Sequence, residues 1–173
     1  DGRALDVRPR AELSDTTPTT RPGTGGPPPL AEIDHGRYEL SDLLGSGGMG
    51  DVWLAFDRRI GREVAVKVAR PDDDEDVARF LREARVQGQL DHPAVVRTFE
   101  SGEERQGAIA YRYLLMEYVE GQTLRELMTA LVRVPESLLR NIALQAAAGL
   151  EVIHGAGAIH RDLKPRNLLI TGD

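Results

Sequence analysis

The sequence predicts an α+β fold in which a small antiparallel sheet with one helix precedes a group of helices. Short apolar and β-branched runs lie within residues 38–69 and 95–116, as expected of strands, and a polar loop is expected at residues 101–107. A helical pattern of apolar residues separates these two groups near residues 77–90, and further helical patterns follow an expected capping box of Thr123 and Glu126. Strands that precede most of the helices are typical of an α+β protein.

Residues 1–36 are expected to form a disordered tail, followed by the sheet at 37–120 and the first later helices at 121–173. Residues 16–29 are rich in proline, threonine and glycine, which bury little apolar surface and favour irregular chain. The threonines between Thr16 and Thr20 belong either to a solvated linker or to a phosphorylated segment. In the second case, the added charge would allow a phosphothreonine-binding domain to dock.

The 173 residues carry a net charge of −6 and contain no cysteine. The acidic balance argues against nucleic acid as a partner, because phosphate backbones select basic surfaces. The absence of cysteine excludes disulfides within the chain and suits a reducing cytoplasm. No apolar run is close to the length of about 20 residues that a helix needs to cross a bilayer. We therefore expect a cytoplasmic chain without a membrane segment, and an anchor beyond Asp173 is left open.

A glycine-rich segment at residues 45–50, Gly-Ser-Gly-Gly-Met-Gly, joins two expected strands. Because few side chains stand in the way, backbone N–H groups of such a hairpin can approach phosphate oxygens. A dinucleotide-binding fingerprint has similar spacing but opens a helix, whereas residues 51–54 have strand character. An ordinary hairpin with a flexible tip is the other alternative for this motif alone.

Lys67 stands among β-branched residues in an expected strand at 63–69. A strand lysine is usually a solvated surface residue. The helix that follows an acidic cluster at 72–76 carries Glu83 beside the apolar Ala84. Taken alone, Glu83 is a surface residue that bonds to a neighbour on the helix.

Residues 160–167, His-Arg-Asp-Leu-Lys-Pro-Arg-Asn, place an acid, a base and an amide in one short polar turn before an apolar run. Phosphoryl transfer from ATP to a hydroxyl needs such a set. A carboxylate orients the hydroxyl, a cation holds the moving phosphate, and an amide oxygen holds magnesium. The alternative is a helix-to-strand turn whose charged side chains are merely solvated. A match over eight residues with few free positions argues against this alternative.

These segments resemble protein kinases. Asp162 with Asn167 five positions later resembles the H-R-D-L-x-x-x-N catalytic loop, and residues 64–67 resemble the V-A-I-K strand. The glycine tip and the Leu-Asp-His-Pro corner at 90–93 are similar to those of bacterial eukaryotic-like serine/threonine kinases. The resemblance implies a protein-kinase-like fold with an antiparallel five-stranded N-lobe and one helix. The first helices and the catalytic loop of an α-rich C-lobe would follow, and that lobe is incomplete because the chain ends before D-F-G.

The resemblance also implies ATP and Mg²⁺ as cofactors and protein substrates with serine or threonine hydroxyls. In that case Asp162 is the catalytic base, Lys164 neutralises the γ-phosphate, and Asn167 holds the metal. Lys67 holds the α- and β-phosphates and pairs with Glu83. The other nucleotide-binding positions form the glycine hairpin, the apolar lid, the hinge and the pocket floor: Leu44, Gly45, Ser46, Gly47, Gly48, Met49, Gly50, Val52, Ala65, Met116, Glu117, Val119 and Leu169.

We therefore expect a serine/threonine protein kinase, with this chain alone lacking efficient activity. One alternative is an ATP-binding module without catalysis. The other is a small-molecule kinase of similar fold, which the Lys164-Pro165 pair after Asp162 disfavours.

Overall fold

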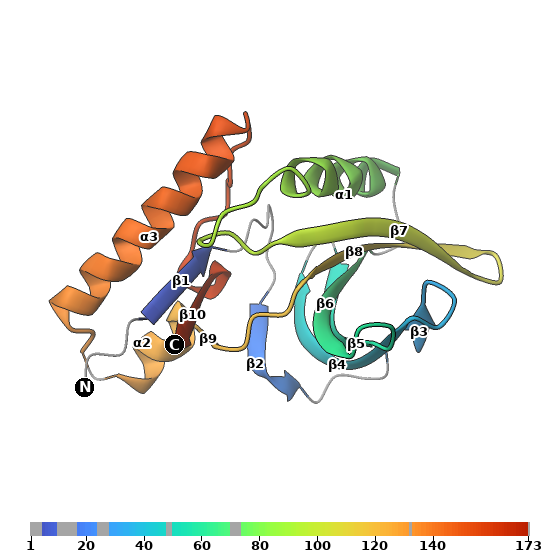
Figure 1. Ribbon diagram of the computed structural model, residues 1–173, viewed down its shortest axis with the longest axis horizontal. Coiled ribbons are helices and arrows are strands. Elements are labelled where there is room, and N and C mark those ends of the chain that lie inside the picture. Colours follow the sequence, from blue (N-terminus) through green and yellow to red (C-terminus); the bar gives the residue numbers. More distant parts are fainter. Residues whose placement is uncertain are drawn as a thin grey trace.

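The computed structural model describes residues 5–9, 17–23, 28–47, 50–69, 74–131 and 133–172. A twisted antiparallel sheet forms one end of the molecule, and the longest helix stands at the other end (Figure 1). The α+β class expected from the sequence is confirmed, because most strands precede the later helices along the chain.

Five strands form the body of the sheet. They are β4 (Tyr38–Gly47), β5 (Gly50–Asp57), β6 (Arg62–Ala69), β7 (Thr98–Gln106) and β8 (Ile109–Glu117). They pair antiparallel in the order β4-β5-β6-β8-β7, as expected of a five-stranded sheet, and two further strands that pair with β4 bring the described sheet to seven strands. Residues 101–106 were expected to form a polar loop, and this is wrong. They extend β7 because polar residues suit the mostly exposed outer part of a hairpin.

Alternation along the strands sends side chains to two faces. Trp53, Val66 and Leu115 are register partners and belong to one buried cluster. Ala65 and Met116 are register partners one position along, and they belong to a second cluster. Six residues of β6, from position 64 to 69, are buried in succession, as expected of a central strand covered on both faces.

In the described part of the chain, three α-helices accompany the sheets. The helix α1 (Asp74–Gln87) follows β6 and buries Phe80 in the second cluster, and α3 (Glu136–Gly155) stands at the far end (Figure 1). The helix α2 (Leu124–Ala130) begins at the expected capping box. Thr123 Oγ1 accepts from the Glu126 N–H at 3.2 Å, and Glu126 Oε2 accepts from the Thr123 N–H at 2.8 Å. Among the described residues, no helix has the length and apolar character to cross a bilayer.

A second, smaller sheet lies beside α2. It consists of β1 (Leu5–Pro9), β10 (Leu168–Gly172) and β9 (Gln122–Thr123), in that order and antiparallel. The short 3-10 helix η1 (Pro165–Asn167) leads into β10. Gly121 precedes β9 where it passes β10, and a Cβ there would lie only 2.4 Å from the Ile170 carbonyl oxygen. The close approach of these two segments therefore requires glycine.

The expectation of a disordered tail over residues 1–36 is wrong for part of that range. Besides β1, the strands β2 (Thr17–Gly23) and β3 (Glu32–Ile33) pair with β4. Leu30 and Ile33 are 4% and 0% exposed and belong to the first buried cluster. These apolar residues follow the last proline of the tail and gain a sheet to pack against, which the local composition does not reveal. Residues 1–4, 10–16 and 24–27 lie outside the described part of the chain.

A buried carboxylate links the end of β5 to the start of β4. Arg37 donates to both oxygens of Asp57, from Nε at 3.3 Å and from Nη2 at 3.0 Å, and the Arg59 N–H donates at 2.9 Å. Asp57 is 1% exposed. Burial alone would raise the pKa of Asp57, but the hydrogen bonds from Arg37 and Arg59 outweigh burial and hold that pKa below its ordinary value.

We expect Asp57 to make stability depend on pH in acid. Because its pKa is lower in the folded state, its contribution is present above the unfolded value near 3.8. The contribution is lost as the pH falls through the folded value. We expect the Asp57→Asn protein to unfold at a lower midpoint urea concentration than the parent protein at neutral pH. The difference between the two midpoints should be smaller in strong acid. Asp91→Asn, at an 81% exposed side chain, is the control. A deficit of Asp57→Asn that stays constant with pH would contradict this role.

Candidate functional site

The three residues expected to carry phosphoryl transfer meet in the turn before β10. Lys164 Nζ lies 2.9 Å from Asp162 Oδ2. Asn167 Nδ2 donates to the Asp162 carbonyl oxygen at 2.9 Å and to Asp162 Oδ2 at 3.0 Å. Arg161 has a φ of 60°, a left-handed conformation that bends the chain just before Asp162. The Asp162 and Lys164 side chains are each 26% exposed, so both can reach a bound substrate.

Asn167 has a buried oxygen that the described part of the fold leaves without a hydrogen-bond donor. The residue is 0% exposed, and its Oδ1 accepts no hydrogen bond within the described residues. Leaving such an oxygen unsatisfied costs about 1–3 kcal/mol. Amide oxygens are ligands of Mg²⁺, which is usually held by few protein groups together with phosphate oxygens and water. The orientation of Asn167 therefore fits a metal ion at Oδ1.

The described residues contain no group of three or more acidic, histidine or cysteine side chains that could enclose a metal ion. In phosphoryl-transfer sites, Mg²⁺ is usually held by one or two protein groups together with phosphate oxygens and water.

Lys67 lies at the centre of the sheet and is 0% exposed. Its register partners are Val52 on β5 and Leu114 on β8, and its Nζ lies 5.9 Å from the centroid of the Phe80 ring of α1. A fully buried lysine is rare in proteins unless it is paired, so the surface-lysine alternative is wrong. Glu83 belongs to α1, but its side chain lies outside the described part. Its pairing with Lys67 stays a prediction.

The second buried cluster brings together the expected lid, hinge and floor of the nucleotide pocket. Its members come from β4, β5, β6, α1, β8, β10 and the segments before β7 and after β8. The six expected nucleotide residues in it are Leu44, Val52, Ala65, Met116, Val119 and Leu169. Apolar walls of this kind suit a flat aromatic ring. Leu169 comes from the smaller sheet, so the cluster spans both sheets.

The same cluster contains residues that the sequence pattern did not single out. Phe80 of α1 is 1% exposed and packs there, and Tyr118 is partly buried against the cluster. Burial, followed by the charges of Glu63 and Glu120, raises the pKa of Tyr118, so its phenol stays neutral. In the sequence, the only indication that Tyr118 belongs to this cluster is its position directly after Met116 and Glu117.

The glycine-rich segment forms a hairpin between β4 and β5. Gly45 pairs with Val52, Ser46 with Asp51 and Gly47 with Gly50, so the segment does not open a helix and the dinucleotide alternative is wrong. Gly50 has a φ of 146°, and a Cβ there would lie 2.2 Å from the Val68 carbonyl oxygen. Glycine is therefore required where β5 begins. Gly48 and Met49 lie outside the described residues.

Ser46 forms a side-chain hydrogen bond with Asp51 across this hairpin. Since the two residues are also register partners, the bond joins the two strands close to the turn. It thereby limits how far the hairpin can open.

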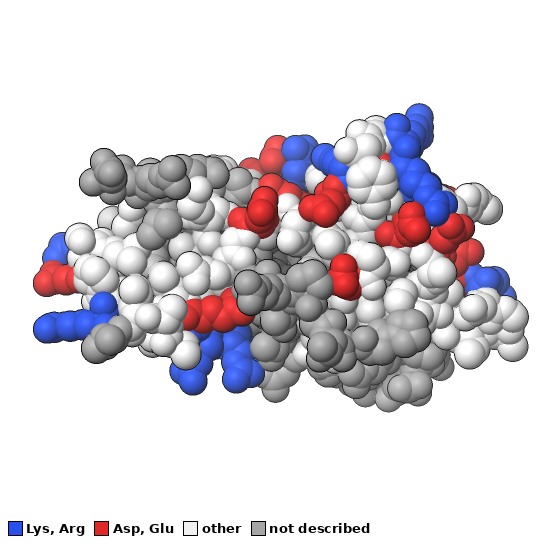
Figure 2. Space-filling view, turned by 90° about the horizontal axis from the view of Figure 1, so that it is seen from below, with Lys and Arg blue, Asp and Glu red and all other residues white. Residues whose placement is uncertain are grey.

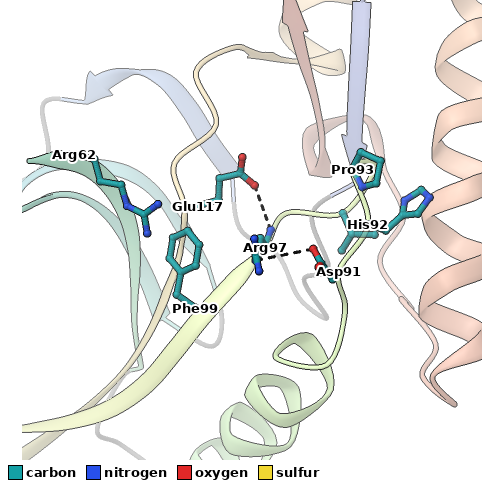
Figure 3. A pocket seen from close by; sticks show the side chains of 8 residues that line it. Arg62, Asp91, His92, Pro93, Arg97, Phe99 and Glu117 are labelled. Carbon is teal, nitrogen blue, oxygen red and sulfur yellow. Dashed lines mark hydrogen bonds and ion pairs between the residues drawn. The ribbon is translucent and has the colours of Figure 1, made fainter. Parts of the chain in front are cut away.

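The expected hinge residue Glu117 is held by the segment that precedes β7. Its N–H donates to the Arg97 carbonyl oxygen at 2.8 Å. A cavity of about 380 Å³ lies beside it. Figure 3 shows Arg97 between Glu117 and Asp91. On the other side of the cavity, Arg62 Cζ lies 4.3 Å from the centroid of the Phe99 ring. Arg97 lies within an apolar run, and nothing in that pattern predicted its contact with the hinge.

Charged side chains of both signs occupy the face shown in Figure 2. Acidic side chains lie mainly across the middle of this view, and basic side chains lie at its upper edge, its lower edge and both ends. A nucleic-acid-binding face is usually a continuous basic patch. The described side chains on this face instead show mixed charge.

Comparisons with known proteins agree with this geometry. A family model described as protein kinase domain matches residues 38–173. A probable serine/threonine-protein kinase of Streptomyces coelicolor is 44% identical over 140 residues, which are 79% of this chain and 21% of that protein. The serine/threonine-protein kinase PknB of Mycobacterium leprae is 42% identical over 148 residues, or 84% of this chain and 23% of that protein.

A solved structure gives the same result. The PknI kinase domain of Mycobacterium tuberculosis, crystallised as a double mutant, matches with a TM-score of 0.65 and 29% identity. The match covers 79% of this chain and 56% of that one. The chain spans 21% and 23% of the length of the two curated relatives named above.

Proposed function

The chain belongs to the protein kinase family, and on that premise we propose that the protein transfers the γ-phosphate of ATP to serine and threonine hydroxyls of protein substrates. The observation that supports this most is the turn in which Asp162 contacts both Lys164 and Asn167. Two relatives named as serine/threonine kinases support the choice of acceptor.

Asp162 orients the acceptor hydroxyl and takes its proton. Its Oδ2 is engaged by Lys164 at 2.9 Å and by Asn167 at 3.0 Å, so Oδ1 is the oxygen that faces the hydroxyl. Lys164 neutralises charge that develops on the moving phosphoryl group. The contact with Asn167 fixes the carboxylate, and such pre-positioning removes part of the entropic barrier to transfer.

The remaining residues hold the nucleotide. Asn167 Oδ1 would hold Mg²⁺, which when bound neutralises phosphate oxygens. Lys67 contacts the α- and β-phosphates, and Glu83 orients Lys67. The backbone of the glycine hairpin covers the phosphates, and backbone groups of Glu117 and Val119 bond the adenine edge.

The location and partners of the protein are part of the same proposal. ATP is supplied in the cytoplasm, and a chain without cysteine suits that reducing compartment. Phosphates on threonines between Thr16 and Thr20 would allow a phosphothreonine-binding domain to dock. Mass spectrometry of the active full-length protein that shows these threonines unmodified would remove the docking proposal.

Acceptor screening tests the main proposal. The full-length protein should transfer labelled phosphate from Mg-ATP to a library of serine- and threonine-containing peptides, and not to aminoglycosides or lipids. Transfer to a small molecule in preference to peptides would favour a small-molecule kinase. Nucleotide binding without transfer to any acceptor would favour a module without catalysis. Either result would overturn the proposed activity.

A large side chain at Ala65 should block the nucleotide while the sheet stays folded. Ala65 is 5% exposed, lies opposite Leu54 and Met116 in register, and belongs to the cluster that would surround adenine. We expect Ala65→Phe to weaken ATP binding about 10-fold or more, equivalent to about 1.4 kcal/mol. Fluorescent nucleotide titration measures the affinity, and thermal melting checks the fold.

Ala110→Phe is the matched control. Ala110 lies near the outer end of β8, opposite Arg105, and is only partly buried. We expect its ATP affinity to equal that of the parent protein. Normal ATP affinity in a folded Ala65→Phe protein would contradict the assignment of this cluster to adenine.

A further inference from the structure

The tail of the chain adds a strand to the edge of the glycine-rich strand. Thr17 is the register partner of Ser46, Pro18 of Gly45 and Gly23 of Leu43. The Thr17 end of β2 thus lies next to the part of β4 that precedes the glycine turn. In Figure 1, β2 lies between β4 and β9, and it contacts both strands.

The strand β2 also contacts β9 and η1. The helix η1 contains Asn167 and follows Lys164 directly. The same short strand therefore meets both sides of the proposed phosphate site, the glycine hairpin and the catalytic turn. Three of its seven residues are Thr17, Thr19 and Thr20, which carry the acceptor group that the proposed function requires.

The sequence of β2 also indicates that it can leave the sheet. Pro18 and Pro22 have no N–H to donate, and the register shifts between Pro18 and Gly23. An edge strand with prolines is held by fewer ladder hydrogen bonds than a central strand. A substrate segment must be able to enter and leave the site, and this strand has the composition for it.

We propose that β2 is an intramolecular substrate of the kinase site, phosphorylated in cis on Thr17, Thr19 or Thr20. This inference rests on the proposed function. The threonine Oγ1 forms a bond to the γ-phosphorus while the bond from that phosphorus to the β–γ bridging oxygen breaks. ADP leaves, and the hydroxyl proton passes to Asp162 and then to water. Tethering holds the acceptor at an effective concentration on the order of millimolar.

Phosphorylation would also change how β2 is held. A phosphate adds a charge of about −1.5 to −2. Beside a site that binds the phosphates of a nucleotide, this charge repels the next ATP as long as β2 remains paired with β4. Release of the modified strand follows, so the reaction clears the tail from the site.

The placement of β2 can be tested without ATP. This chain contains no cysteine, so within these 173 residues a Thr17→Cys, Ser46→Cys pair in the full-length protein can form one disulfide. Partners in an antiparallel ladder lie about 4.5–5.5 Å apart at Cα, within the range of about 4.4–6.8 Å that a disulfide spans. We expect a bridge under mild oxidation, detected by peptide mapping without reductant.

The matched control pairs Ser46→Cys with Thr129→Cys, because Thr129 is an exposed residue of α2. No bridge is expected there. Absence of the Thr17–Ser46 bridge, or equal bridging in both proteins, would overturn the placement of β2 and with it the proposal.

The reaction itself is tested by incubating the full-length protein with Mg-ATP and mapping phosphate by mass spectrometry. Phosphate should appear on β2 and not on Thr129. Its first-order rate constant should stay unchanged when protein concentration varies about 100-fold, because transfer is intramolecular. A protein inactivated by Lys67→Met should gain no phosphate on β2 when mixed with an active protein whose three β2 threonines are alanine.

An external serine/threonine peptide in the same reaction separates the two proposals. Phosphorylated peptide with unmodified β2 overturns this inference and leaves the proposed function standing. Phosphate on β2 of the Lys67→Met protein shows transfer between molecules and also overturns it. If no acceptor is phosphorylated, the proposed function fails, and the inference fails with it.

Discussion

Replacing Asp162 with asparagine is expected to lower kcat for peptide phosphorylation about 10²- to 10⁴-fold, with little change in ATP affinity. Asparagine keeps the size of the side chain but cannot take the hydroxyl proton. It also loses the ionic contact with Lys164, which lies 2.9 Å from Asp162 Oδ2. Steady-state kinetics of the full-length protein with a serine/threonine peptide measures kcat, and fluorescent nucleotide titration measures ATP affinity.

Glu136→Gln is the control for charge removal, because Glu136 lies in the first turn of α3 with an 85% exposed side chain. Its kcat should equal that of the parent protein. The melting temperature of Asp162→Asn shows whether the turn before β10 stays folded. An undiminished kcat in a folded Asp162→Asn protein would remove Asp162 from the chemistry. Loss of ATP affinity at unchanged kcat would mean that Asp162 acts on the nucleotide instead.

Local sequence signals predicted those elements that depend on residues close together in the sequence. Short runs of apolar and β-branched residues located β5 and β6, because such runs favour strands that are buried in a sheet. Thr123 and Glu126 predicted the start of α2, because their side chains accept hydrogen bonds from backbone N–H groups at the N-terminus of the helix. The order of Asp162, Lys164 and Asn167 predicted that they lie in one short polar turn, and there Lys164 and Asn167 both contact Asp162. Their catalytic role stays a prediction.

Features that depend on distant partners could not be predicted in this way. Leu30 and Ile33 are buried only because the sheet folds beside them, while the preceding prolines and threonines suggest a solvated tail. The pairing of β2 with β4 depends on an open strand edge, which no residue of β2 encodes. The contact of Arg97 with the hinge joins residues 20 positions apart. Within the described residues, Asn167 Oδ1 accepts no hydrogen bond because of its burial and the orientation of its amide, and neither can be read from the sequence.

The second large effect is expected at Lys67. We expect Lys67→Met to lower kcat/KM for ATP about 10²- to 10³-fold, by analogy with the loss of one preorganised electrostatic group. Methionine fills similar space in a position that is 0% exposed, between Val52 and Leu114. The substitution should therefore leave the sheet folded, and a normal melting profile would attribute the loss to the missing charge. Unchanged kcat/KM would exclude Lys67 from nucleotide binding.

A double-mutant cycle decides whether Glu83 acts through Lys67. If Glu83 orients Lys67, then Glu83→Gln alone should lower kcat/KM, and adding it to Lys67→Met should cause no further loss. Residues in contact typically show a coupling energy of about 0.5–3 kcal/mol, whereas independent residues show additive effects. Glu151→Gln, at an exposed position of α3, is the control for glutamate removal. Additive effects would mean that Glu83 is a helix-surface residue, whereas coupling would place both charges in one site and link α1 to the phosphates through the central strand.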